Sequence, residues 1–236
     1  MKLWYVNIWL SPETGYDQHF RYQFTLHTRF ISNYFSKILR KKSNWFETDG
    51  SFNMISVEPM PDSLKDCRIV PEKVLTVSVP FDKARYEMIK GTSNYDYYLE
   101  MLEAGFRKAS NYKQIPLNNL LNLITEFKAN GYKNEWIHTN KRFKEYDIEI
   151  TLICQFTTLD FKLLATINKI STKKPLCFGV ILRTDADEIC YDKTFKDVFI
   201  KEDKIIITDG FDRPSFSINL CDALNKKFNC ELLKLN

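Results

Sequence analysis

Acidic side chains are concentrated between residues 185 and 204, and their types could support metal-dependent chemistry. A metal nuclease needs carboxylates that converge on a divalent ion, together with a lysine that stabilises the attacking water or the developing charge. An acid-x-Lys pattern stands before the apolar residues 205–207, but residues 202–203 also fit a hairpin tip, where charged side chains are simply solvated. The candidate residues for a metal-dependent nuclease or hydrolase are Asp185, Asp187, Asp192, Glu202 and Lys204.

The same segment is also a candidate surface for binding a protein partner. Acidic residues outnumber basic residues between positions 185 and 203, and a local field of one sign steers association with a partner of the opposite sign. Two tryptophans near the expected ends of elements could anchor an interface or cap the core. The predicted partner-binding residues are Asp185, Asp187, Glu188, Asp192, Trp45 and Trp136. The simpler interpretation of the acidic segment is a solvated loop and hairpin.

Motifs of the common enzyme classes are absent from the chain. There is no GxGxxG, GxxxxGK[ST], HExxH or GxSxG sequence. The histidines at positions 19, 27 and 138 are not at metal-ligand spacing, and no two of the six cysteines form a CxxC pair. We therefore predict no catalytic residue, no metal and no cofactor, and we expect the cysteines to be reduced, buried thiols.

A basic run without acidic residues is a third candidate, because it could bind phosphate or RNA. Aromatic side chains at positions 34, 45 and 46 lie near it, but no RNP-type motif accompanies them. Cations at the C-terminus of a helix also simply offset the helix macrodipole, for about 0.3–1 kcal/mol. The formal net charge of +4 is too small to favour a nucleic-acid partner. The residues of the run are Arg29, Lys37, Arg40, Lys41 and Lys42.

The elements that position these residues are clearest in the middle of the chain. Apolar residues recur at helical spacing over 95–106 and again over 116–129, and then alternate over 148–156 and 161–167. These patterns predict two amphipathic helices followed by an antiparallel hairpin, with the helices layered on the sheet.

Patterns in the flanking regions complete an α+β fold with a mostly antiparallel sheet and helices packed on one side. Residues 3–10 are apolar on both faces, which predicts a central strand with Trp4 and Trp9 in the core. A strand over 20–26 and a helix over 28–40 should follow. Further strands are expected at 52–57, 74–79, 176–182, 189–191, 198–200, 205–208 and 216–220, with a helix after Asp82 and a closing helix capped by Asn219 or Asp222. We expect one domain, in which residues 1–92 could form a strand-rich part and 93–236 the remainder.

The N-terminal sequence lacks the features of a signal peptide, and no apolar run has the length of a membrane span. We therefore expect a cytoplasmic protein without a membrane partner.

Several short sequences resemble the helical part and later strands of immunity proteins from bacterial polymorphic toxin systems. They are Tyr97-Tyr98-Leu99-Glu100, Ile115-Pro116-Leu117, Gly131-Tyr132, Glu135-Trp136, Ile181-Leu182-Arg183-Thr184-Asp185 and Phe195-Lys196-Asp197-Val198. The resemblance covers about the last 140 residues, and it implies a cytoplasmic inhibitor that binds a cognate toxin domain and blocks its active site. No functional residue carries over, because such families place their contacts variably. Since inhibitors of cationic nucleases are expected to be acidic, a target of that kind would dock on residues 185–203.

Overall fold

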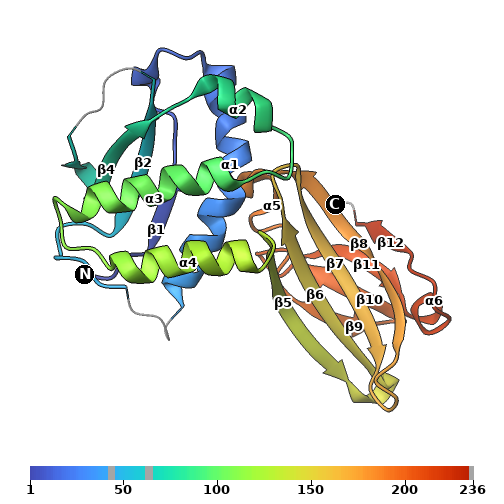
Figure 1. Cartoon of the computed structure of the whole chain (residues 1–236). Coiled ribbons are helices and arrows are strands. Elements are labelled where there is room, and N and C mark those ends of the chain that lie inside the picture. Colours follow the sequence, from blue (N-terminus) through green and yellow to red (C-terminus); the bar gives the residue numbers. More distant parts are fainter. Residues whose placement is uncertain (42–45, 62–65, 234–236) are drawn as a thin grey trace. The chain divides into compact units, whose positions relative to one another are not determined.

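The computed structural model describes residues 1–41, 46–61 and 66–233 and has an α+β fold (Figure 1), as the sequence predicts. The chain forms two compact units, Met1–Asn134 and Glu135–Asn236. The N-terminal unit holds the longest helices and one sheet, and the C-terminal unit holds two sheets. None of the helices in the described part of the chain has the length and hydropathy needed to cross a bilayer.

Three parallel strands and one short antiparallel strand form the sheet of the N-terminal unit. The order is β1 (Tyr5–Ile8), β2 (Met54–Met60), β4 (Val74–Pro80) and β3 (Arg68–Val70). β1 and β4 pair with β2 in parallel, and β3 pairs with β4 antiparallel. This sheet differs from the antiparallel pairing expected, because the chain passes from β1 to β2 through a helix and not through a tight turn.

Helix α1 (Gln18–Arg40) makes that crossover and includes residues 20–26, which were expected to form a strand. Phe20, Phe24 and Ile31 recur at helical spacing, and the last two are fully buried. The aromatic residues at even positions between 20 and 26 also recur with the period of two that is typical of a strand. Residues 20–26 therefore fit both a helix and a strand, and the predicted strand was wrong.

α1 lies along the outer edge of β1 and satisfies its backbone. Ser36 Oγ accepts a hydrogen bond from the Val6 amide at 3.3 Å and donates to the Val6 carbonyl at 3.4 Å. Thr28 Oγ1 donates to the Ile8 carbonyl at 3.3 Å. The predicted strand at residues 3–10 is therefore an edge strand and not a central one, because a helix and not another strand occupies its second edge.

Trp4 and Trp9, expected in the core, are 47% and 38% exposed. Val6 and Ile8 are buried, and Tyr5, which alternates with them, is 40% exposed. β1 thus buries one face and leaves aromatic rings on the other. The apolar composition of both faces concealed this difference.

Helices α2 (Lys83–Ile89), α3 (Asp96–Ser110) and α4 (Leu117–Ala129) complete the N-terminal unit. α3 lies so close to the sheet that a Cβ built on Gly105 would stand 2.5 Å from Cγ2 of Val57. The two central helices predicted from sequence are confirmed, but they belong to this unit and pack with its sheet and α1. The hairpin that follows them in the sequence belongs to the C-terminal unit.

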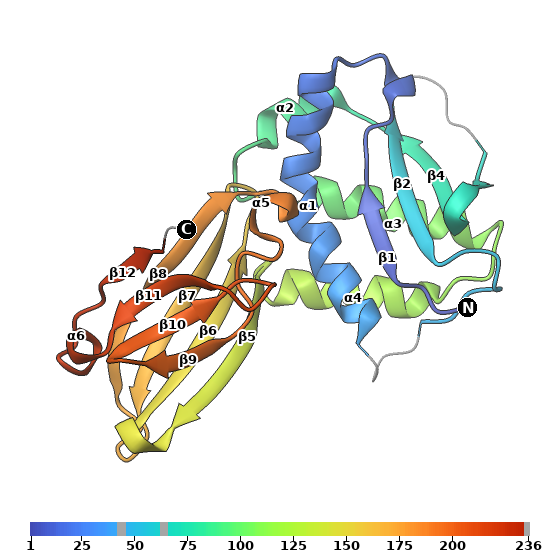
Figure 2. The ribbon, with the colours of Figure 1, turned by 180° about the vertical axis from the view of Figure 1, so that it is seen from behind.

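The C-terminal unit is a sandwich of two antiparallel four-stranded sheets, which lie face to face in both views (Figures 1 and 2). One sheet orders β5 (Asn134–Phe143), β6 (Ile148–Phe156), β7 (Asp160–Lys169) and β8 (Pro175–Asp185). The other orders β12 (Cys230–Leu232), β11 (Pro214–Asn219), β10 (Lys204–Thr208) and β9 (Val198–Lys201). The predicted hairpins β6–β7 and β9–β10 are confirmed.

Two short helices and three 3-10 turns connect these strands and those of the N-terminal unit. Residues 189–191, expected to be a strand, belong to helix α5 because Asp187 caps its N-terminus. The expected closing helix is α6, capped by Asn219. The bounds are α5 (Glu188–Tyr191), α6 (Leu220–Leu224), η1 (Pro12–Thr14), η2 (Pro71–Lys73) and η3 (Lys144–Tyr146).

All six cysteines lie among the described residues, and none of them forms a disulfide bond. Cys154 and Cys177 are buried in strands, as the sequence indicates, and burial raises the pKa of Cys177. Cys190 and Cys221 are exposed, so the expectation that all the thiols are buried was wrong for these two.

The edge contact of α1 generates a prediction for stability. Replacing Ser36 by Ala leaves the amide and carbonyl of Val6 unsatisfied at a buried edge, which costs about 1–3 kcal/mol. S36A should therefore lower the free energy of unfolding of the N-terminal unit by about 1–3 kcal/mol, measured by urea titration with tryptophan fluorescence. S32A is the matched control, because Ser32 Oγ donates to the carbonyl of Thr28 in the same helix. Equal losses in the two variants would refute the edge-capping role.

Candidate protein-binding surface

Three segments meet at one end of the C-terminal sandwich and form a surface that we call the loop end: residues 157–160, 185–197 and 209–213. The strand register places Asp160 directly opposite Asp185, where β7 begins and β8 ends. The first two segments therefore lie side by side.

Ring stacking and a backbone hydrogen bond hold the loop end together. The rings of Phe161 and Tyr191 stack with their centroids 3.6 Å apart, which fixes α5 to the start of β7. The amide of Gly210 donates to the carbonyl of Lys193 at 2.7 Å, which joins the third segment to the second.

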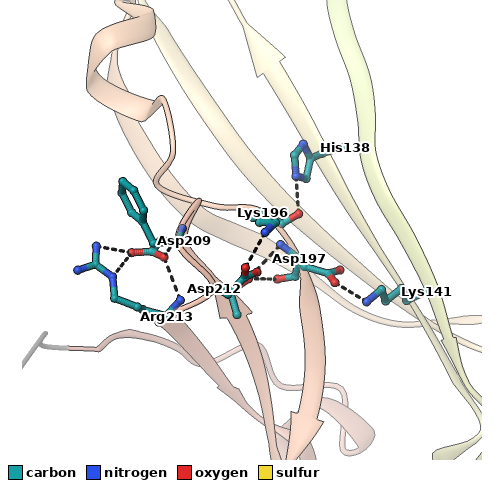
Figure 3. A network of polar contacts seen from close by, with 9 residues as sticks. His138, Lys141, Lys196, Asp197, Asp209, Asp212 and Arg213 are labelled. Atoms are coloured by element: carbon teal, nitrogen blue, oxygen red, sulfur yellow. Dashed lines mark hydrogen bonds and ion pairs between the residues drawn. The ribbon is translucent and has the colours of Figure 1, made fainter.

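A single carboxylate organises the turn between β10 and β11. Asp209 is only 6% exposed, and its Oδ1 accepts hydrogen bonds from the amides of Phe211 at 2.8 Å and Arg213 at 3.0 Å. Its Oδ2 accepts from Nε of Arg213 at 2.9 Å, and Figure 3 shows the guanidinium facing the carboxylate. The backbone of this turn is therefore fixed by its own side chains.

The turn presents Phe211, whose side chain is 65% exposed. The ammonium group of Lys193 lies 5.8 Å from the ring centroid, and the guanidinium carbon of Arg213 lies 5.1 Å from it. Cations at these distances are attracted to an aromatic face. They limit the motion of a ring that projects into solvent.

A second polar network ties the segment 195–197 to β5 (Figure 3). Nζ of Lys141 pairs with Oδ2 of Asp197 at 2.6 Å. Nε2 of His138 lies 2.8 Å from the carbonyl of Lys196, whose own ammonium group pairs with Asp212 at 2.7 Å. These groups satisfy one another, and the arrangement contains no pair of nucleophile and base.

The network lowers the pKa of both central carboxylates. Burial by itself would raise the pKa of Asp209, but the hydrogen bonds from Arg213 and Phe211 outweigh burial and lower it. Burial likewise opposes the lowered pKa of Asp197, which results mainly from the hydrogen bond with Lys141. Both groups are therefore held as carboxylates at neutral pH.

The predicted acidic residues have different roles in the structure. Asp187 is 5% exposed and caps α5, with the amide of Ile189 donating to its Oδ1 at 3.0 Å. Asp185 and Asp192 are exposed at the loop end, and Glu188 is half-buried. The loop end thus brings the predicted acidic residues together, but only part of the set faces solvent.

The structure does not assemble the candidate metal site. Glu202 lies in the turn between β9 and β10, and the length of β9 separates it from the loop end. Among the described residues, no three His, Cys, Asp or Glu side chains gather closely enough to hold a metal ion. The acid-x-Lys pattern is the solvated hairpin tip that the sequence offered as its alternative.

Of the two predicted tryptophans, the structure describes only Trp136, which is not an exposed anchor. Trp136 is half-buried, and its ring centroid lies 6.1 Å from that of Phe161, so it packs on the aromatic core of the sandwich. Trp45 lies outside the described residues.

Exposed apolar side chains at the loop end were missed by the sequence reasoning. Ile189 is 80% exposed on α5, and Phe211 projects from the turn. Each is an apolar residue within a run of acidic residues or turn formers. This polar sequence context was the signal from which their exposure could have been predicted. A period-two interpretation of residues 189–191 placed Ile189 in a strand and concealed it.

The histidines do not point to catalysis. His27 lies in the N-terminal unit with Nδ1 2.9 Å from the hydroxyl of Tyr86, and burial lowers the pKa of its imidazole. Tyr86 is fully buried among aromatic rings. His19 contacts Gln23 on the exposed start of α1. No described histidine faces a carboxylate in the manner of a catalytic pair.

Comparison with protein-family models, curated proteins and solved structures gives no match.

The buried carboxylate of Asp209 generates a pH prediction. Because its pKa is lowered on folding, its contribution to stability is present above the unfolded-state pKa of about 3.9 and is lost as the pH falls through the folded-state pKa. The difference in unfolding free energy between wild type and D209N should be constant near neutral pH and shrink below about pH 4, measured by urea titration. D212N is the control, because the carboxylate of Asp212 is 68% exposed and its ion pair should contribute little. A D209N deficit that is unchanged at low pH would contradict this role.

Proposed function

We propose that this protein is an immunity-type inhibitor that acts in the cytoplasm, binding a cognate bacterial toxin domain and blocking its active site. The observation that supports the proposal best is the loop end, where Ile189 and Phe211 project from short, hydrogen-bonded segments. The resemblance of the sequence to immunity proteins gives the class of partner.

The exposed side chains suit a binding surface for energetic reasons. A few residues dominate most protein interfaces, and aromatic and arginine side chains are enriched among them. Phe211 and Arg213 are already ordered by Asp209, so little conformational entropy is lost when a partner covers them. A turn fixed in this way can insert an aromatic ring into a concave site without rearranging.

The charges around the two apolar side chains favour a partner with a basic rim. Asp185 and Asp192 are exposed on the side of α5, whereas Lys193 and Arg213 lie against the ring of Phe211. Acidic groups at the rim accelerate association with a cationic protein and contribute less to its retention. A toxin that acts on nucleic acid presents a surface of this charge.

The proposal predicts that both apolar side chains carry affinity for one partner. The tagged protein would be used to isolate that partner, and its affinity for the purified protein would be measured by calorimetry. F211A and I189A should each weaken binding about tenfold or more, because central side chains at interfaces contribute about 1–2 kcal/mol or more. Each should also reduce the rescue of growth when the partner is expressed as a toxin.

L224A is the matched control, because Leu224 is 43% exposed in the same unit but belongs to α6. Its affinity should equal that of wild type. A partner that binds all three variants equally would exclude the loop end as the interface, and a partner whose expression does not arrest growth would exclude the immunity-type function.

A further inference from the structure

One face of the N-terminal sheet carries no helix, and aromatic side chains stand on it. Figure 2 shows β1, β2 and β4 in front of α3, which covers the opposite face. Tyr5 and Trp9 share the uncovered face, since they alternate with the buried residues Val6 and Ile8. Trp9 continues the strand because its amide donates to the carbonyl of Val57 at 3.0 Å.

Two aromatic side chains of this face are therefore exposed, at 40% for Tyr5 and 38% for Trp9. A single exposed aromatic residue needs no explanation, but several together mark an interaction surface.

Basic side chains lie at one end of this aromatic row. The guanidinium carbon of Arg40 lies 5.3 Å from the ring centroid of Tyr5, and the ammonium group of Lys2 donates to the carbonyl of Lys41 at 3.2 Å. Arg40 and Lys41 are exposed at the end of α1. Part of the basic run identified in the sequence is thus brought beside Tyr5 of β1.

The charge of the molecule agrees with this arrangement. The whole formal net charge of +4 lies in residues 1–134, since residues 135–236 contain equal numbers of acidic and basic side chains. Four residues of β2 and β4 that share the face of Tyr5 and Trp9 are buried, namely Ser56, Glu58, Thr76 and Ser78, so at these positions the exposed part of this face is confined to β1. The backbone of Glu47 forms an isolated antiparallel β-bridge with that of Lys2, and the side chain of Glu47 is exposed near this end of β1.

We propose that the aromatic face, defined by Tyr5, Trp9, Arg40 and Lys41, binds a single-stranded polynucleotide. Unpaired bases stack on aromatic rings, and cations beside the rings contact the phosphates. A duplex offers stacked bases that cannot reach the rings, so a single strand is the chemistry that fits both features. The site lies in the N-terminal unit and is independent of the inhibitory function proposed for the loop end.

The test uses the full chain and two labelled oligonucleotides, a twelve-nucleotide poly-U RNA and the corresponding poly-dT DNA, with fluorescence anisotropy as the readout. Both should bind in low salt, and the stronger of the two identifies the natural sugar. A duplex of the same length should bind at least tenfold more weakly. The double variant Y5A/W9A should lose at least tenfold in affinity, because each stacked base depends on one ring.

The variant R40Q/K41Q keeps both rings and changes the salt dependence instead. Each phosphate contact contributes about 0.7 to the slope of log affinity against log salt for a single strand, so this variant should lower the slope by roughly 1.4. R107Q/K128Q removes the same charge from α3 and α4, on the helical side, and should leave the slope unchanged. Circular dichroism of each variant verifies that it is folded.

Three results would overturn the proposal. They are no binding of either oligonucleotide by the wild type, equal affinity for single strand and duplex, or unchanged affinity in folded Y5A/W9A. If Y5A/W9A instead abolished binding of the toxin partner, the aromatic face would be a protein interface and the polynucleotide site would be excluded. If Y5A/W9A lost oligonucleotide binding but still bound the toxin partner, the result would support the polynucleotide site. It would not test the interface proposed at the loop end.

Discussion

The hydroxyl of Ser36 exchanges hydrogen bonds with both the amide and the carbonyl of Val6, and this contact determines how the N-terminal unit can be built. A parallel strand at a sheet edge exposes a row of backbone groups that another chain could pair with. Here α1 occupies the edge of β1 and satisfies it with short side chains. Because the helix lies beside the sheet, α3 covers one face and the other face stays free of helices (Figure 2).

The same requirement, that polar groups be satisfied, shapes the proposed binding surface of the C-terminal unit. Asp209 bonds two amides and a guanidinium, so the turn that holds Phe211 is ordered before any partner arrives. Stability and recognition are linked at this point. The buried carboxylate keeps an apolar side chain exposed, a position that a mobile loop would cover by collapsing onto the sandwich.

The two exposed surfaces differ in chemistry. The loop end combines Ile189 and Phe211 with charges of both signs, which suits a protein partner of defined shape. The aromatic face combines rings of β1 with cations from α1 in the unit that holds the net positive charge.

Local patterns were sufficient to determine most elements and the α+β class, because α3, α4 and the hairpin β6–β7 each have one consistent period over many residues. The sequence also showed an acidic segment and none of the motifs of the common enzyme classes. The sequence could not decide between a helix and a strand in residues 20–26, where both periods fit. It also could not decide whether Trp4 and Trp9 lie in the core or at the surface, because burial depends on which element occupies the second edge and the second face of a strand. Only the tertiary structure placed α1 beside β1, separated Glu202 from the other acidic residues of the predicted metal site, and left Phe211 exposed on a turn fixed by Asp209.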